Sequence, residues 1–262
     1  MNFHLTGKKA LLLASSQGLG LGIAAKLCEE GADVMISGRD EQKLNKASAS
    51  LNGAGPGSCR YCVADLSKRD ASHILFDSAV NTFGTLDILV NNVGGPPPGS
   101  VEDQDLETWR NQFEIMVIRL IELTNLSLAG MREKQWGRIL TVASSSVVQP
   151  IPGLSVSNTI RSAIVGWNKS LANEIAGDGI TANILAPGRI ATERVRQIDA
   201  LRAEKEHISV AEVRERSMAS IPVGRYGTVE EFGAVGAFLV SEQASYITGT
   251  VIRCDGGLVR SV

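Results

Sequence analysis

Ser157 and Arg161, in the stretch SNTIRSAIVG (157–166), place a hydroxyl group and a permanent cation four positions apart. An α-helix rises 1.5 Å per residue, so side chains four apart lie on one face, about 6 Å along the axis, where they can share a site. A serine is also an ordinary residue at a helix start, and an arginine four residues later is ordinary helix surface. The local pattern alone leaves open both a catalytic pair and a polar helix start.

The elements that must position this pair follow an alternation of short apolar runs and amphipathic stretches. The apolar runs fit strands that are buried on both faces, at residues 10–14, 33–37, 62–64, 86–91, 138–143 and 180–186. The amphipathic stretches fit helices at residues 19–30, 40–51, 67–83, 102–134 and 155–176. A repeated βα unit predicts a single-domain Rossmann-type α/β fold over residues 1–262, with a doubly wound parallel sheet and helices on both faces.

Residues 192–220 interrupt this alternation with a charged, helix-prone segment. An insertion after the sixth expected strand lies at the carboxyl edge of the sheet, where open α/β sheets bind ligands and where lids occur. A pair of solvated surface helices fits the composition of the segment equally well. The segment is therefore expected to be either a lid-like insertion or a surface appendage.

The composition favours a small-molecule partner. The 262 residues include 26 basic and 28 acidic side chains, for a formal net charge of −2, so we expect no binding to nucleic acid. No apolar run reaches the roughly 20 residues that span a bilayer, and KKALLLASS is too short for a signal peptide. We therefore expect no membrane association and a cytoplasmic location. Cys59 and Cys62 form a C-x-x-C, but strand positions three apart face opposite ways and no second pair completes a zinc site, so no metal is expected.

A glycine triplet lies where the first expected strand passes into the first helix. Gly18, Gly20 and Gly22 permit a tight turn and let a pyrophosphate approach the helix N-terminus, whose free N–H groups favour anions. This position in a βαβ unit predicts a dinucleotide site. At the end of the second strand, MISGRD offers Arg39 where an NAD site usually supplies an acid. Arginine bonds a 2′-phosphate with charge assistance, which favours NADP(H) over NAD(H), although Asp40 follows directly and is able to contact the ribose instead.

Further motifs make the chain resemble the short-chain dehydrogenase/reductase family over essentially its whole length. They are LASSQGLG (13–20), ADL (64–66), NNVGG (91–95), GRILTVASS (137–145), NILAPGRIATE (183–193) and IPVGRYGTVEEFGAVGAFLVSEQASYITGTVIRCDGG (221–257). The last motif is long and specific, and it is most similar to the 3-oxoacyl-acyl-carrier-protein reductase branch. The resemblance implies an NAD(P)(H)-dependent oxidoreductase that acts on a carbonyl or hydroxyl group of a small molecule or an acyl thioester.

The resemblance also implies roles for single residues. Asp65 is expected to contact adenine, Asn91 to support the sheet edge beside the cofactor, and residues 187–192 to embrace the nicotinamide amide. Ser144 aligns with the family's catalytic serine, which polarises the substrate carbonyl, while Ala14 stands where the first glycine of the loop is usual. The expected cofactor residues are Ser15, Ser16, Gly18, Leu19, Gly20, Arg39, Asp65, Leu66, Asn91, Val93, Gly94, Arg161, Pro187, Gly188, Ile190 and Thr192.

Three positions depart from the family pattern in ways that affect catalysis. The family has a tyrosine thirteen residues after the catalytic serine and a lysine four residues later, and these positions hold Ser157 and Arg161 here. A helical asparagine of the family falls at Met116. The expected catalytic residues are therefore Ser144, Ser157 and Arg161, in an atypical site.

These replacements change the proton chemistry that the site can perform. Hydride transfer to a ketone builds negative charge on oxygen, and the family's tyrosine donates a proton there with help from the lysine charge. A serine hydroxyl is less acidic than a phenol, whose pKa is near 10, and its side chain is shorter. An arginine can hold the ribose but does not release a proton near neutral pH. Within the insertion His207 is a substitute acid to consider, whereas Tyr61, Tyr226 and Tyr246 fall outside the family's tyrosine position.

The sequence therefore supports two functions. The first is an oxidoreductase in which Ser144 polarises the carbonyl, Arg161 anchors the ribose and Ser157 orients a hydroxyl or a water. The second is a non-catalytic dinucleotide-binding or assembly protein on the same fold. Apolar stripes lie around Met116 and along residues 160–175. Members of the family associate through these helices, so the resemblance implies a homo-oligomer, a dimer or tetramer. Packing against the chain's own sheet accounts for part of each stripe.

Overall fold

Seven parallel strands form one sheet in the part of the chain that the structure describes. The computed structural model describes residues 2–261, and the strand order is β3-β2-β1-β4-β5-β6-β7. The strands are β1 (Lys9–Leu12), β2 (Asp33–Gly38), β3 (Cys59–Val63), β4 (Ile88–Asn91), β5 (Gly137–Val142), β6 (Ile180–Pro187) and β7 (Val251–Cys254). Every neighbouring pair is parallel, which requires crossover connections rather than hairpins.

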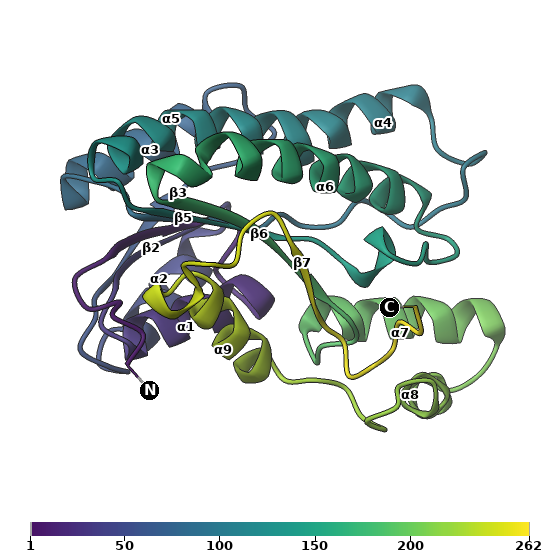
Figure 1. Cartoon of the computed structure of the whole chain (residues 1–262). Coiled ribbons are helices and arrows are strands. Elements are labelled where there is room, and N and C mark those ends of the chain that lie inside the picture. Colours follow the sequence, from purple (N-terminus) through teal and green to yellow (C-terminus); the bar gives the residue numbers. More distant parts are fainter. Residues whose placement is uncertain (1, 262) are drawn as a thin grey trace.

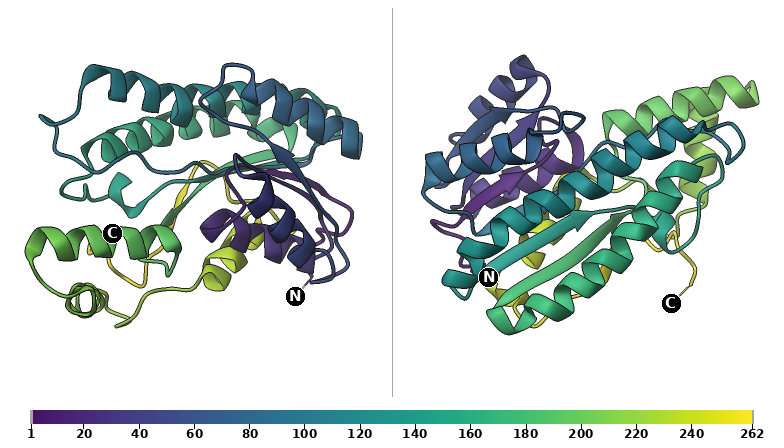
Figure 2. Two further views of the ribbon diagram at one scale, coloured as in Figure 1. Left: turned by 180° about the vertical axis from the view of Figure 1, so that it is seen from behind. Right: turned by 90° about the horizontal axis from the view of Figure 1, so that it is seen from above.

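Helices cover both faces of the sheet, as Figures 1 and 2 show. One face carries α1 (Gly18–Glu29), α2 (Glu41–Leu51) and α9 (Val229–Leu239). The other carries α3 (Ala71–Phe83), α4 (Leu106–Phe113), α5 (Arg119–Glu133) and α6 (Ser155–Ile175). The predicted doubly wound Rossmann-type α/β fold is confirmed. None of the described helices combines the length and apolarity that a bilayer crossing needs.

The hydrophobic core consists of two layers, one on each face of the sheet. Leu11 packs into the layer under α3, α5 and α6, and its neighbour Leu12 packs into the layer under α1, α2 and α9. Cys59 and Cys62 divide in the same way, because side chains three apart on a strand point to opposite faces. The structure thus confirms that these two thiols do not face each other.

Two regions differ from the elements expected from the sequence. The helix expected at 102–134 begins later, where Asp105 accepts a hydrogen bond from the Thr108 N–H at 2.6 Å and caps α4. A π-helical turn, η1 (Glu114–Ile118), then separates α4 from α5, and hydrophobic periodicity does not reveal such an inserted residue. Helix α9 and strand β7 also add a further βα unit beyond the expected ones.

The charged insertion forms two helices, α7 (Glu193–Glu206) and α8 (Val210–Ala219), which lie together below the carboxyl end of β6 in Figure 1. The Thr192 and Ser209 hydroxyl groups cap their N-termini. Arg194 of α7 donates a hydrogen bond to the Pro96 carbonyl at 3.1 Å. Helix α7 therefore contacts the loop that follows β4, at the edge of the sheet where a Rossmann fold binds its ligand.

Candidate functional site

The glycine-rich loop after β1 is fixed by hydrogen bonds to β2. Ser15 N–H donates to the Ser37 carbonyl at 2.8 Å, and Ser15 Oγ accepts from Ser37 N–H at 3.0 Å while it donates to the Leu12 carbonyl at 2.8 Å. Ala14 has a φ of 44°, in the left-handed region that favours glycine, and Gly18 has a φ of 62°. The loop therefore keeps the turn of a glycine-rich phosphate loop even where alanine replaces glycine.

Asn92 joins this loop to the end of β4. Its Nδ2 donates to the carbonyl oxygens of Leu13 and Ala14 at 3.2 and 3.0 Å. A Cβ atom on Gly20 would lie 2.8 Å from Asn92 Nδ2 and 2.9 Å from Ser15 Cα, so glycine is required there for close packing. Sequence reasoning singled out Asn91 and missed this bridging role of Asn92, for which the doubled asparagine in NNVGG is the available signal.

The N-terminus of α1 is open to an anionic ligand. Gln17 occupies the N-cap position, and its side chain makes no capping hydrogen bond. The first-turn N–H groups and the helix dipole thus remain available for a phosphate. A Cβ atom placed on Gly18 would meet Thr192 at 3.7 Å, so the loop after β6 approaches this helix start. These features fit the pyrophosphate of a dinucleotide.

Arg39 and Asp40, at the end of β2, have different surroundings. The Asp40 carboxylate accepts the Lys43 N–H at 3.0 Å as the N-cap of α2 and pairs with the Lys43 ammonium at 3.5 Å. Arg39 is exposed and, within the described residues, forms no ion pair. The pKa of Asp65 is held low by the Ser67 backbone N–H and, to a smaller extent, by the charge of Arg39. Arg39 and Asp65 thus lie near each other, and Asp40 is already engaged.

The end of β4 supplies a buried amide and an open backbone. Asn91 is fully buried, and its Nδ2 donates to Thr124 Oγ1 at 3.2 Å. The Val93 carbonyl accepts a hydrogen bond from Arg161 Nη2 at 3.4 Å. Gly94 has no atom within 4 Å of the position that a Cβ would take, so a ligand can approach its backbone.

Ser157 and Arg161 lie together on α6, beneath the ends of β4 and β5. Arg161 Nε donates to Ser157 Oγ at 3.3 Å, and Nη1 donates to the Val142 carbonyl at 3.0 Å. Among the described residues no carboxylate lies within 4.0 Å of this guanidinium. Burial lowers the pKa of Arg161 to about 10, which still leaves it charged at neutral pH. The structure thus places an uncompensated positive charge at the carboxyl edge of the sheet.

Ser144 lies two residues past the end of β5 and caps the 3₁₀ turn η2 (Ser145–Val147). Its Oγ accepts the Ser146 N–H at 3.1 Å, and its side chain is half-buried. In the described part of the chain no hydrogen bond joins Ser144 to Ser157 or to Arg161. The hydroxyl proton of Ser144 therefore remains free to donate to a ligand.

A cavity of about 10 Å³, roughly the size of one water, lies beside Arg161. Met116 of the π-helical turn lines it together with Thr141. Thr141 Oγ1 is buried and has no hydrogen-bond partner among the described residues. Met116 thus places an apolar side chain next to a buried hydroxyl group.

The loop at residues 187–192 is held from two sides. Gly188 N–H donates to the Cys254 carbonyl at 2.9 Å, and a Cβ on Gly188 would lie 2.6 Å from Asp255 Cα. On the other side, Ala191 N–H donates to the Gly227 carbonyl at 2.8 Å. Ile190 is buried between these anchors. The loop is therefore a firm wall beside the N-terminus of α1.

None of the substitute acids considered from the sequence has a suitable place among the described residues. His207 is exposed and ends α7 in the left-handed conformation. The Tyr226 hydroxyl donates to Asp199 Oδ2 at 2.9 Å, and burial raises the pKa of Tyr226. Tyr246 is fully exposed. Ser144, Ser157 and Arg161 remain the candidate catalytic residues at the carboxyl edge.

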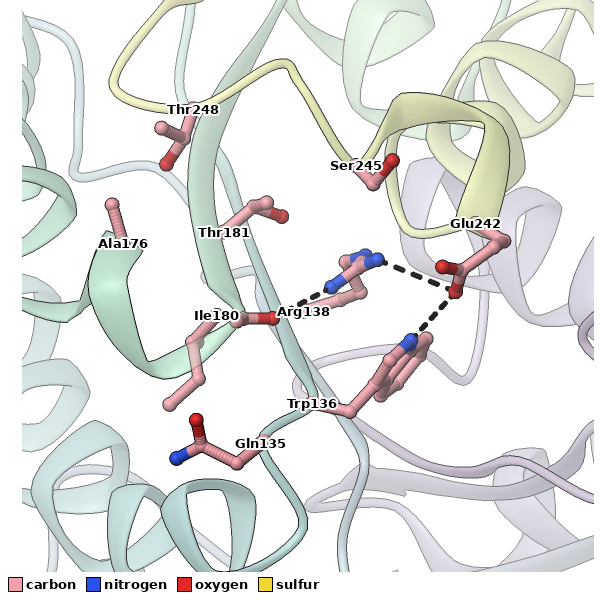
Figure 3. Close-up of a pocket in the computed structure, with 10 residues that line it drawn as sticks. Gln135, Trp136, Arg138, Ala176, Ile180, Thr181, Glu242, Ser245 and Thr248 are labelled. Carbon is pink, nitrogen blue, oxygen red and sulfur yellow. Dashed lines mark hydrogen bonds and ion pairs between the residues drawn. The ribbon is translucent and has the colours of Figure 1, made fainter.

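A larger cavity, of about 200 Å³, lies at the opposite edge of the sheet, where β5 and β6 begin (Figure 3). Arg138 is 2 % exposed and donates to the carbonyl oxygens of Ser241, Gly137 and Gly179. Its remaining nitrogen faces Glu242, which also accepts from Trp136 Nε1 at 2.7 Å. Arg138, Glu242 and Trp136 thus bond to one another and to backbone carbonyls, and the cavity lies at the edge of the sheet away from the glycine-rich loop.

Comparison with known proteins agrees with this arrangement. Residues 13–259 match the family model described as Enoyl-(Acyl carrier protein) reductase. D-beta-hydroxybutyrate dehydrogenase of Cupriavidus necator is 36 % identical over 256 residues, which cover 97 % of this chain and 99 % of that protein. The 3-oxoacyl-[acyl-carrier-protein] reductase of Haemophilus influenzae is 33 % identical, with 98 % and 100 % of the two chains covered.

A solved structure shows the same likeness. L-sorbose reductase from Gluconobacter frateurii, complexed with NADPH and L-sorbose, superposes with a TM-score of 0.94 at 27 % identity, and each chain is covered to 100 %. The fold, the glycine-rich loop and the full-length match lead to the same conclusion. The chain belongs to the short-chain dehydrogenase/reductase family of NAD(P)-dependent oxidoreductases, which act on carbonyl and hydroxyl groups.

Proposed function

We propose that this chain is an NADP(H)-dependent oxidoreductase whose active site uses Ser144, Ser157 and Arg161, with Ser157 and Arg161 in place of the family's tyrosine and lysine. The observation that carries the proposal is the partly buried Arg161 guanidinium, which donates to Ser157 Oγ and to two carbonyls near the strand ends without an acidic partner in the described residues. Partial burial of a charge without an ionic partner costs free energy, and charges perturbed in this way are typical of functional sites.

The preference for NADP(H) rests on the end of β2. Asp40 is engaged as the cap of α2, so it is poorly available to the ribose, whereas exposed Arg39 is free to bind a 2′-phosphate. NADP(H), when bound, supplies or accepts a hydride. The residues that would hold it are Ser15, Ser16, Gly18, Leu19, Gly20, Arg39, Asp65, Leu66, Asn91, Val93, Gly94, Arg161, Pro187, Gly188, Ile190 and Thr192. That NADPH accompanies the related L-sorbose reductase supports the same preference.

Ser157 and Arg161 can act together on a proton. A guanidinium N–H that donates to Ser157 Oγ stabilises negative charge on that oxygen, which makes the hydroxyl a better proton donor. Ser144 supplies a second donor toward the substrate oxygen. Serine remains a weaker acid than tyrosine, so we expect catalysis to be slower than with the family's relay by up to the ~10²–10⁴ that a general acid contributes.

The oligomeric state and the lid-like role of residues 192–220 form part of the proposal. Phe113 and Ile118, at the junction of α4 and α5, are 42 % and 37 % exposed, and such apolar side chains favour a homo-oligomer, a dimer or tetramer. The chain acts as one functional domain, and a small molecule or an acyl thioester is the substrate. The cytoplasmic location expected from the sequence stays a prediction.

Fluorescence titration with NADPH and NADH tests cofactor binding, and the absence of saturable binding by either cofactor would refute the proposal. Turnover is then measured with ketones, 3-oxoacyl thioesters and alcohols. We expect activity with at least one of these classes. A Ser144→Ala variant should lose most of it, and an unchanged rate in that variant would count against Ser144 as the polarising residue.

The second candidate function is a dinucleotide-binding or assembly protein without turnover. It is favoured by Met116, which places an apolar side chain where the family relay has an amide. The triple variant Ser157→Tyr/Arg161→Lys/Met116→Asn separates the two functions. If the wild type binds NADPH without turnover and the triple variant turns over, the non-catalytic function is correct and the three positions are those of the family relay.

A further inference from the structure

A buried polar cluster ties helix α7 to the loop at residues 187–192. Asp199 of α7 is 3 % exposed, and its Oδ1 accepts from Arg189 Nη1 at 2.5 Å. Its Oδ2 accepts from the Tyr226 hydroxyl at 2.9 Å, and Tyr226 is 8 % exposed. A buried carboxylate is costly unless both oxygens are bonded, as they are here.

The other acids of α7 behave differently. Glu193 pairs with Arg196, and Glu206 pairs with Arg202 and with Arg216 of α8, each at an exposed position. Exposed pairs of this kind contribute little to stability. Asp199 differs from these acids because it is buried and because both of its partners come from outside the α7–α8 segment.

Both partners of Asp199 belong to the wall beside the proposed cofactor site. Arg189 lies in the loop at residues 187–192, and its carbonyl accepts from the Gly227 N–H at 2.9 Å. Tyr226 precedes Gly227, so the cluster and the backbone bond hold the same two loops together. Burial raises the pKa of Tyr226, which keeps its hydroxyl protonated as a donor to Asp199. Loss of the Asp199 bonds would therefore remove one tie between α7 and these two loops, while the Arg194–Pro96 hydrogen bond would remain.

We propose that Asp199 is a positioning residue that fastens the α7–α8 segment to the loop at residues 187–192 and thereby sets the affinity for the cofactor. In this arrangement the α7–α8 segment packs against one side of the site. Movement of the segment away from the site requires the Arg189–Asp199–Tyr226 bonds to break. The predicted effect on cofactor affinity rests on the proposed binding of NADP(H). The attachment of the α7–α8 segment to the loop at residues 187–192 does not depend on that binding.

Limited trypsin digestion of the cofactor-free protein tests the fastening. The cleavage sites available within the segment are Arg194, Arg196, Arg202, Lys205, Arg214 and Arg216. Cleavage follows the population of the open form, and removal of one partner from a buried charged cluster raises that population strongly. We expect Asp199→Asn to be cut within the segment at least about tenfold faster than wild type. Glu193→Gln, an exposed acid of the same helix, is the matched control and should be cut at the wild-type rate.

The affinity for NADPH tests the second half of the proposal. Asp199→Asn should raise the Kd and the KM for NADPH about tenfold and leave kcat within about twofold, a split that general unfolding would not produce. Tyr226→Phe removes a hydroxyl alone and should move both readouts in the same direction by less, which keeps the test informative if Asp199→Asn folds poorly.

The digestion experiment and the affinity measurement test different parts of the proposal. Wild-type cleavage rates in both variants would overturn the fastening, and faster cleavage with unchanged NADPH affinity would overturn the link to the cofactor loop. Failure of the wild type to bind NADPH would overturn the proposed function while leaving the digestion result valid.

Discussion

Arg39→Ala is predicted to change the cofactor preference of this enzyme. The side chain is exposed at the end of β2 and has no ion-pair partner among the described residues, so its removal breaks no contact of the fold. What it removes is a charged donor for the 2′-phosphate that distinguishes NADPH from NADH. The substitution should therefore act on one cofactor and spare the other.

The size of the effect follows from the exposure of Arg39. Hydrogen bonds to charged groups contribute roughly 1.5–3 kcal/mol, and solvent screening at an exposed position places Arg39 at the low end, about 1–2 kcal/mol. This corresponds to an increase of about 5–30-fold in the Kd for NADPH. The Kd for NADH, which lacks the phosphate, should change by less than about threefold. High salt should reduce the difference, because it screens an exposed charge.

Fluorescence titration of both cofactors at two salt concentrations is the assay, with Asp40→Ala as control. The control removes the cap of α2 and should lower the stability of the protein without changing the ratio of the two affinities. Equal losses for NADPH and NADH in Arg39→Ala would refute the assignment. So would a change of preference in Asp40→Ala instead.

Two further predictions concern stability. Gly22→Ala should lower the free energy of unfolding by about 1–2 kcal/mol, because its Cβ would lie 2.5 Å from the Val229 carbonyl oxygen of α9. Gly130→Ala has no atom within 4 Å of its Cβ and should raise the free energy of unfolding by up to about 1 kcal/mol through helix propensity. Chemical denaturation measures both changes, and two changes of the same sign would refute the packing argument. Arg225 and the Thr228 N–H lower the pKa of Glu231 from 4.5 to about 2, so the stability they give is complete above pH 4.5 and is lost as pH falls through about 2. Arg225→Gln should therefore flatten the pH dependence of unfolding in that window, and an unchanged acid limb would contradict the role of the pair.

Much of the fold could be predicted from local patterns. Apolar runs located the strands from β1 to β6 because a doubly covered parallel sheet buries both faces of each strand. The opposite orientation of Cys59 and Cys62 followed from strand geometry alone. The π-helical turn at Met116 could not be predicted, because an inserted residue in a helix leaves the apolar composition of the stretch unchanged.

In the candidate site, the sequence allowed prediction only of contacts between residues that are close together in the chain. Ser157 and Arg161 four apart on a helix do form a hydrogen bond, as the spacing indicated. The bridging contacts of Asn92 and the burial of Asp199 depend on loops that are distant in sequence. Asp199 stands among solvated charges in the sequence, so composition pointed to a surface residue. Tertiary contacts of this kind leave no periodic signal.

We propose that Ser157 performs proton chemistry with the help of Arg161. The most direct test is the kcat for NADPH oxidation with an accepted carbonyl substrate, compared between wild type, Ser157→Ala and the control Ser162→Ala, an exposed serine on the same helix. We expect Ser157→Ala to lower kcat by at least about tenfold while the Kd for NADPH stays within about twofold, and we expect Ser162→Ala to keep the wild-type kcat. A wild-type kcat in Ser157→Ala would contradict this proposal.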